Sequence, residues 1–251
     1  MSDANPLSGK VAIVTGAGRN IGRAIALALA ADGAKVTVNA RSNRAEAEAV
    51  VSEIVAKGGE AAVVIGSVGE PSTAETLAAE TMKQFGRIDI LVNNAAIRRE
   101  APLNNLDFAQ WREVMGTILD GSFLCVKAIS PHMAAAGGGS IVNIGGVSAH
   151  TGAKNRVHVI TAKSGLIGFT RALAHDLAGD GITVNCIVPG LIDTARDPSK
   201  ALPSHHQVNR TLVGRLGGPE EVAAAVCYLV GPNARYITGQ TMHVNGGAYL
   251  G

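Results

Sequence analysis

Hydrophobic residues along the chain alternate between short continuous runs and longer stretches with helical spacing. Seven runs are predicted to be strands: Val11–Thr15, Lys35–Ala40, Ala61–Gly66, Ile88–Asn93, Ser140–Ile144, Ile182–Val188 and Thr241–Val244. Most of these runs are apolar throughout, which is typical of strands buried on both faces of a sheet. The pattern therefore predicts a parallel sheet covered on both sides.

The stretches between the runs have apolar residues at the spacing of a helix. They are Ile21–Asp32, Asn43–Lys57, Ser72–Phe85, Ser122–Ala136, His158–Ala178 and Glu220–Leu229, the last preceded by Pro219. Repeated strand–helix units predict right-handed crossovers, with helices on both faces of the sheet. No internal repeat or low-complexity linker interrupts them. We expect an α/β protein with one Rossmann-like, doubly wound domain over residues 1–251 and a parallel sheet of about seven strands.

Composition narrows the class of protein. The chain of 251 residues is 47% hydrophobic but only 3% aromatic, which suits small side chains packed closely on a sheet. A net charge of +2 and the lack of basic runs argue against nucleic-acid binding. The first ten residues lack the apolar region of a secretory signal, and the apolar runs are shorter than a membrane span. We expect a cytoplasmic protein with a small-molecule substrate and no nucleic-acid or membrane partner.

The cysteines and histidines do not indicate a metal site. Cys125, Cys186 and Cys227 are odd in number, lie far apart and lack the spacing of metal ligands. We therefore expect reduced, mostly buried thiols and no bound metal.

A glycine-rich turn follows the first predicted strand and precedes the first predicted helix. It comprises Gly16-Ala17-Gly18-Arg19-Asn20-Ile21-Gly22. Glycine lets the backbone approach a pyrophosphate, whose charge is stabilised by the N-terminus of the helix. The glycine pattern alone is weak, but its place between strand and helix predicts a dinucleotide site.

Four motifs, in order along the whole chain, resemble those of the short-chain dehydrogenase/reductase family. The turn from Thr15 to Gly22 is similar to the family's TGxxxGIG. The other three are Asn93-Asn94-Ala95-Ala96, similar to NNAG; Pro189-Gly190 through Thr194, similar to PGxxxT; and Gly239-Gln240-Thr241 through Val244-Asn245-Gly246-Gly247, similar to the C-terminal strand. The chain most resembles the 3-oxoacyl-carrier-protein reductases of that family. Asn20 replaces the middle glycine of the turn, and asparagine tolerates left-handed backbone geometry.

The end of the second predicted strand favours NADP over NAD. An NAD site usually has an acid there to bind the ribose 2′-hydroxyl, whereas this strand is followed by Arg41. Arg41 and Arg19 suit a 2′-phosphate; two solvated surface arginines are the alternative. The resemblance implies cofactor contacts from Gly16, Gly18, Arg19, Asn20, Ile21, Gly22, Arg41, Ser67, Val68, Asn94, Ala95, Ala96, Lys163, Pro189, Gly190, Ile192 and Thr194.

The resemblance also implies hydride transfer between a nicotinamide and a carbonyl/alcohol pair, assisted by Ser, Tyr, Lys and a helical Asn. The segment Thr161–Thr170 matches the surroundings of the family lysine, which assigns that role to Lys163. The tyrosine position, four residues earlier, is Val159. The serine and asparagine positions are Gly146 and Ile118. None of these three side chains has an exchangeable proton, so the chain is an atypical member.

Nearby residues could supply the lost proton donor. Candidates on the connecting loop and helix are Ser148, His150, Lys154, Arg156 and His158. His158 and His150 are preferred because imidazole titrates near neutral pH, although His158 is rotated by about 100° from position 159 on a helix. Three hypotheses remain open: an NADP-dependent oxidoreductase with a remodelled proton donor, a nucleotide-binding protein without redox turnover, and a different reaction on the same scaffold.

Substrate and assembly are the least defined. The segment from Leu191 to Gly214 corresponds to the family's substrate lid and contains Arg196, Lys200, His205, His206 and Arg210. Together with Arg98 and Arg99 it could form a cationic rim for an acidic or phosphorylated substrate. Asp193, Asp197 and Glu100 dilute this charge, and a solvated rim is the alternative. The resemblance implies a homotetramer that pairs Ser122–Ala136 and Lys163–Ala178.

Overall fold

The computed structural model describes residues 5–194 and 211–251, and it contains the predicted parallel sheet. The strands are β1 (Val11–Val14), β2 (Lys35–Ala40), β3 (Ala61–Ile65), β4 (Ile90–Asn93), β5 (Gly139–Ile144), β6 (Ile182–Pro189) and β7 (Thr241–Val244). Their order is β3-β2-β1-β4-β5-β6-β7, and every neighbouring pair is parallel. The prediction of a seven-stranded, doubly wound domain is confirmed. The five basic residues predicted in the lid, and Asp197, lie outside the described residues.

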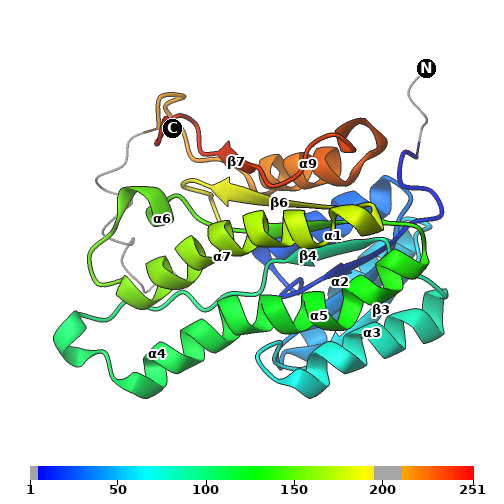
Figure 1. Ribbon diagram of the computed structural model, residues 1–251, viewed down its shortest axis with the longest axis horizontal. Helices are drawn as coiled ribbons and strands as arrows, with labels where there is room; N and C mark the ends of the chain where they lie inside the picture. Colours follow the sequence, from blue (N-terminus) through cyan, green and yellow to red (C-terminus); the bar gives the residue numbers. More distant parts are fainter. Residues whose placement is uncertain (1–4, 195–210) are drawn as a thin grey trace.

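Helices cover both faces of the sheet (Figure 1). One face carries α1 (Asn20–Ala31), α2 (Arg44–Ala56) and α9 (Pro219–Val230), and the other carries α3 (Pro71–Phe85), α5 (Gly121–Ala135) and α7 (Val157–Asp176). Short 3-10 turns lie at Leu103–Asn105, Ala178–Asp180 and Pro232–Ala234. The result is three layers, with the sheet in the middle.

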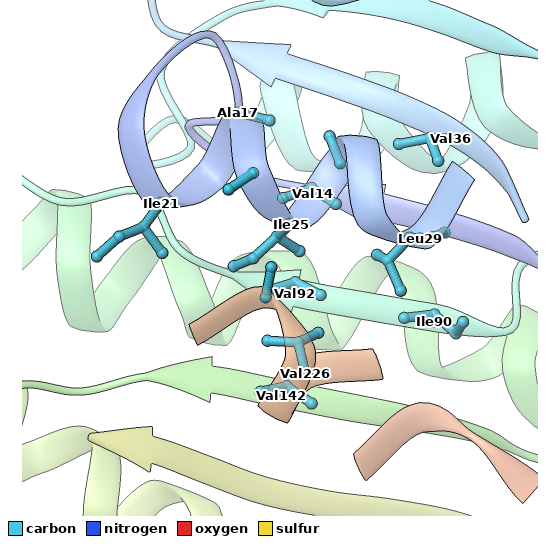
Figure 2. Close-up of a cluster of buried hydrophobic side chains, with 14 of the residues drawn as sticks. Val14, Ala17, Ile21, Ile25, Leu29, Val36, Ile90, Val92, Val142 and Val226 are labelled. Atoms are coloured by element: carbon cyan, nitrogen blue, oxygen red, sulfur yellow. The ribbon is translucent and has the colours of Figure 1, made fainter. Parts of the chain in front are cut away.

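Successive strand residues point to opposite faces, so each strand contributes to two cores. Ala12 and Val14 pack with α1, whereas Ile13 packs with α3 and α5. Figure 2 shows one face of α1, with Ile25 and Leu29, directed toward Ile90 of β4. This burial on both sides explains why the strands are apolar throughout.

A long helix precedes β5 and begins earlier than the sequence predicted. It joins α4 (Phe108–Met115), a π turn (Gly116–Asp120) and α5 into one continuous helix, visible along the lower part of Figure 1. The Asp107 side chain caps its start by accepting a hydrogen bond from Gln110 N at 2.7 Å. The prediction began at Ser122 because polar residues and two glycines interrupt the helical pattern before it.

The joined helix Phe108–Ala135 has 28 residues and contains an 18-residue window with a mean hydropathy of 1.2, enough by length and composition to cross a membrane. The sequence prediction of short apolar runs did not anticipate it. The core helices of sheet proteins also satisfy this criterion, and the helix packs against α3 and α7. Its length is therefore weak support for a membrane span.

The carboxyl ends of the strands define where a site can form. The strand order reverses between β1 and β4, because the chain leaves β1 toward β2 and later returns to the other side of β1. Open parallel sheets bind ligands in the crevice outside the strand ends at such a switch point. The three cysteines are free thiols, and Cys125 and Cys186 are buried.

Candidate functional site

The turn after β1 has the geometry of an anion-binding loop. Gly16 and Asn20 have positive φ angles of 61° and 51°. The prediction that asparagine can replace glycine at position 20 is thus confirmed by its left-handed backbone. Arg19 precedes α1 in an extended conformation, and no side chain caps the helix. The first amide groups of α1 are therefore available to an anion.

Hydrogen bonds join this turn to the loop after β4. The Thr15 hydroxyl accepts hydrogen bonds from Asn94 N at 2.9 Å and Ala95 N at 3.1 Å, and it donates to Val92 O at 3.2 Å. The Asn94 side-chain amide donates to Thr15 O and Gly16 O at 2.9 and 3.0 Å. These bonds fix the two loops that flank the switch point.

All seventeen predicted cofactor residues line a single cleft of about 1040 Å³ at the carboxyl edge of the sheet. The turn, the loop after β4 and the residues after β6 meet there, although they are far apart in the sequence. The volume reaches the upper end of the range of small-molecule and cofactor pockets, roughly 300–1,000 Å³. The cleft can therefore accommodate a dinucleotide together with a small substrate.

The sequence reasoning missed the role of Asn39 at the end of β2. This buried side chain accepts a hydrogen bond from Gly16 N at 3.3 Å and donates to Val64 O and Gly66 O at 3.2 and 3.1 Å. It thereby fixes the glycine turn to β3. A buried polar residue at the end of an apolar strand was the available signal.

Two arginines line the cleft near the end of β2, at its outer part. Arg41 lies 3.4 Å from Glu113, which also bonds Arg99 at 2.7 Å. The side chains of Arg41 and Glu113 are 60% and 38% exposed, and such solvated pairs contribute little free energy. Arg41 can therefore exchange Glu113 for an anionic ligand at small cost. Arg19 lines the same part of the cleft.

A buried polar chain positions α7 against the sheet. Asn93 Nδ2 donates to Asn143 Oδ1 at 2.9 Å, and Asn143 Nδ2 donates to Thr170 Oγ1 at 2.9 Å. About two turns earlier on α7, the Lys163 ammonium donates to the carbonyl of Ile144 at the end of β5. Burial, followed by the charges of Arg98 and Arg156, lowers the pKa of Lys163 to about 8.

The surroundings of Lys163 are largely apolar. Val159 and Gly146 line the cleft beside it. Val159 packs with Ile118, Ala162 and Leu166 in a buried cluster, which places apolar atoms at two of the positions that the resemblance assigns to a proton relay. Gly146 leaves open space, since a Cβ built there meets no atom within 4 Å.

The two histidines predicted as replacement acids do not belong to the described lining of the cleft. His158 is fully buried, and burial, then the charges of Arg156 and Arg99, lower its pKa. His150 lies in α6 (Ser148–Thr151), with its ring centroid 4.6 Å from that of His243. Burial and the charge of Arg171 lower its pKa. The packing therefore gives neither imidazole direct access to a ligand.

Two of the other loop candidates do line the cleft, namely Ser148 and Arg156. Arg156 is 7% exposed and directly precedes α7. It lies three residues before Val159 and seven before Lys163, so the three side chains share one face of the helix. This spacing was the signal for Arg156 that the preference for imidazole overlooked.

Known proteins with the same architecture match the chain almost end to end. A family model described as "Enoyl-(Acyl carrier protein) reductase" matches residues 16–249. The 3-oxoacyl-[acyl-carrier-protein] reductase of Synechocystis sp. is 43% identical over 97% of this chain and 98% of its own. The chain belongs to the short-chain dehydrogenase/reductase family. The FabG 3-oxoacyl-[acyl-carrier-protein] reductase of Escherichia coli is 41% identical over 96% of this chain and 98% of its own.

Solved structures of the family include nucleotide complexes. A short-chain dehydrogenase from Burkholderia cenocepacia in complex with NADP is 34% identical, with a TM-score of 0.90 over 97% of this chain and 99% of that one. A blue fluorescent protein from a metagenomic library in complex with NADPH has the same identity and TM-score over 98% of this chain and 100% of that one. The prediction of NADP from Arg19 and Arg41 agrees with both complexes.

We predict that Gly22→Ala disrupts the cleft. A Cβ at position 22 would lie 2.3 Å from Gly16 O and 2.5 Å from Asn94 Nδ2. Relieving these contacts must displace the turn, so the free energy of unfolding should fall by about 1–3 kcal/mol and dinucleotide binding should weaken. Chemical denaturation and a fluorescence titration with NADPH measure the two effects.

Gly168→Ala in α7 is the matched control, because its Cβ meets no atom within 4 Å. Alanine in a helix should stabilise the protein by roughly 0.5–1 kcal/mol and leave nucleotide binding unchanged. Wild-type stability and binding in Gly22→Ala would contradict the described geometry of the turn.

Proposed function

We propose that this protein is an NADPH-dependent reductase that converts a carbonyl group to an alcohol, and that Lys163 replaces the usual phenol as proton donor. The observation that carries the proposal is the convergence of all seventeen predicted cofactor residues, Lys163 among them, on one cleft. The printed activity of the relatives makes a 3-oxoacyl group the first substrate class to test.

The choice of NADP rests on residues at the end of β2. No acid follows this strand to accept a ribose hydroxyl, and Arg41 and Arg19 line the cleft there. Gly16 packs closely against the loop after β4, since a Cβ on it would lie 2.9 Å from Ala95 Cα. Bound NADPH supplies the hydride. The chain itself binds it through the turn, Arg19 and Arg41.

The proposed proton donor follows from what remains of the family's relay. Positions 146, 159 and 118 hold Gly, Val and Ile, so the serine, tyrosine and asparagine of that relay have no equivalent here. Lys163 remains, and its buried ammonium has a pKa near that of an efficient general acid at neutral pH. The ammonium can therefore protonate a substrate oxygen placed in the cleft beside Val159.

A nucleotide-binding protein without redox turnover is the second candidate. The apolar packing of Ile118 and Val159 favours it, because two relay positions have become part of a core. NADPH binding without oxidation of NADPH by any carbonyl substrate would support this candidate over the reductase. Assembly as a homotetramer and a cytoplasmic location stay predictions.

We expect Arg41→Gln to lower the affinity for NADPH by about 10-fold or more, because one charge-assisted contact is lost. The affinity for NADH, which has no 2′-phosphate, should change little. Fluorescence titrations with both dinucleotides measure this difference. Arg44→Gln is the matched control, because Arg44 is 64% exposed and pairs with Glu48. An equal loss for both dinucleotides in Arg41→Gln would rule out a specific contact with the 2′-phosphate.

We expect kcat/KM for carbonyl reduction to stay level below pH 8 and to fall as the pH rises through about 8. The folded pKa of Lys163 is lowered to about 8, so its ammonium loses the proton in this range. Lys163→Arg keeps its positive charge over this pH range. Its kcat/KM should therefore not fall near pH 8, even if it is lower than that of wild type. The measurement is a pH series with a fixed carbonyl substrate.

His150→Gln and His158→Gln test the earlier candidates in the same series. Both should keep the wild-type profile. The pKa of each imidazole is lowered from its usual value. If a histidine were the donor, the rate would therefore decline with rising pH at a pH below 6.5, where the imidazolium loses its proton. Replacement of that histidine would abolish the reaction. That outcome would exclude Lys163 as the donor.

We expect Val159→Tyr combined with Gly146→Ser to raise the rate of carbonyl reduction by about 10²-fold or more, since a placed general acid contributes 10²–10⁴-fold. The serine fits because position 146 opens on free space. Val159→Phe with Gly146→Ser is the control of similar size without the phenol. Equal rates for the two double variants would show that the missing phenol does not limit the reaction.

A further inference from the structure

The end of the cleft that borders α2 contains an acid that has no part in the predicted cofactor contacts. Besides Arg19 and Arg41, the described lining there includes Glu46, in the first turn of α2. A phosphate monoester carries a charge of about −1.5 to −2 at neutral pH, so a nearby carboxylate repels it. The region predicted to hold a 2′-phosphate thus contains a group that opposes it.

The start of α2 places this carboxylate against the glycine turn. Asn43 caps the helix by accepting a hydrogen bond from Glu46 N at 3.2 Å, which fixes the first turn. A Cβ built on Gly18 would lie 3.3 Å from Glu46 Cβ and 3.6 Å from Glu46 Oε2. Because Gly18 directly precedes Arg19, the carboxylate lies close to the point where the arginine leaves the turn.

The usual structural role of a glutamate at this position is to complete the helix cap. At the third position of a helix, its side chain commonly accepts a hydrogen bond from the backbone N–H of the capping residue, here Asn43. Among residues 5–194 and 211–251, the Glu46 carboxylate forms neither this hydrogen bond nor an ion pair. The half-buried side chain is therefore left to act on a ligand in the cleft.

The charges around the predicted 2′-phosphate are balanced. Arg41 lies 3.4 Å from Glu113, and Arg19 forms no ion pair with another described residue. Two arginines thus stand against two carboxylates, Glu46 and Glu113. A phosphate that displaces Glu113 from Arg41 leaves Glu113 paired with Arg99 at 2.7 Å. Glu46 has no such partner, so its charge remains beside the phosphate.

We infer that Glu46 limits the preference of the cleft for NADP over NAD by repelling the 2′-phosphate. The inference rests on the NADP binding that forms part of the proposed function, and not on the reduction of a carbonyl. NAD has a neutral hydroxyl in place of the phosphate, so the carboxylate does not repel it in the same way. Glu46 is thereby a residue that determines cofactor selectivity.

Fluorescence titrations of Glu46→Gln with NADPH and NADH test the inference. Glutamine keeps the size of the side chain and removes its charge. The affinity for NADPH should rise by about 3- to 10-fold, since one partly solvated charge beside a phosphate is removed, and that for NADH should change by less than about 2-fold. The gain should shrink in about 0.5 M salt, because ions screen the repulsion.

Glu48→Gln is the matched control on the same helix. Glu48 is 55% exposed, pairs with Arg44 and does not belong to the described lining of the cleft. Its affinities for both dinucleotides should equal those of wild type. Unchanged NADPH affinity in Glu46→Gln would overturn the inference. A loss of NADH affinity would also overturn it, because the carboxylate would then bind a ribose hydroxyl.

Calorimetric titrations with adenosine 2′,5′-bisphosphate and with 5′-AMP need no turnover, and the two ligands differ only in the 2′-phosphate. Glu46→Gln should bind the bisphosphate about 3- to 10-fold more tightly than wild type does, and 5′-AMP equally well. If this result is obtained but no carbonyl is reduced, the role of Glu46 stands and the reductase proposal fails. If carbonyls are reduced but both proteins bind the bisphosphate equally, the reductase stands and the role of Glu46 is overturned.

Discussion

The hydroxyl of Thr15 and the side-chain amide of Asn94 together fix the point from which the cleft is built. They join the loops after β1 and β4, the two strands between which the strand order reverses. Buried backbone groups in such loops must find hydrogen-bond partners. The Thr15 hydroxyl accepts from the backbone of the loop after β4, and the Asn94 side chain donates to the backbone of the loop after β1. The close contact of Gly16 with Ala95 follows from this pairing, as does the need for small residues at both positions.

A second set of hydrogen bonds positions α7 at the end of the cleft that contains Lys163. The chain from Asn93 through Asn143 to Thr170 crosses β4 and β5 and ends on α7, entirely within the interior. The two hydrogen bonds join β4, β5 and α7, so the three side chains favour one arrangement of helix and sheet. The face of α7 that contains Arg156, Val159 and Lys163 is positioned by that arrangement.

Within this frame the residues predicted to contact the cofactor line one cleft, and Lys163 is among them. Nucleotide binding depends on backbone geometry and a few charges, which tolerate changes at distant side chains. Proton transfer depends on single groups, and residue 159, to which the resemblance assigns a phenol, is a valine. With an apolar cluster on one side and arginines on the other, the ammonium of Lys163 is desolvated and less basic. The role proposed for Lys163 as a proton donor depends on this lowered pKa.

The sequence by itself determined the seven strands, the helices that cover them and the glycine turn, because these depend on local periodicity and on backbone preferences. Even the left-handed geometry at Asn20 followed from the residue type. The residues predicted to contact a cofactor line one cleft, and their contacts with a nucleotide stay a prediction. The early start of the long helix was missed, because its π turn and glycines break the 3.6-residue period on which the prediction relied.

Only the tertiary structure decided which polar groups reach the ligand. His150, His158 and Arg156 lie within a short segment, and their chemistry favoured the histidines. Packing instead buries His158 in the interior and places His150 in a T-shaped contact with His243 of β7, while Arg156 lines the cleft. These outcomes depend on contacts between α6, α7 and the C-terminal strand, which are distant in sequence. Side-chain access is set by such contacts rather than by residue type, so no local pattern could determine it.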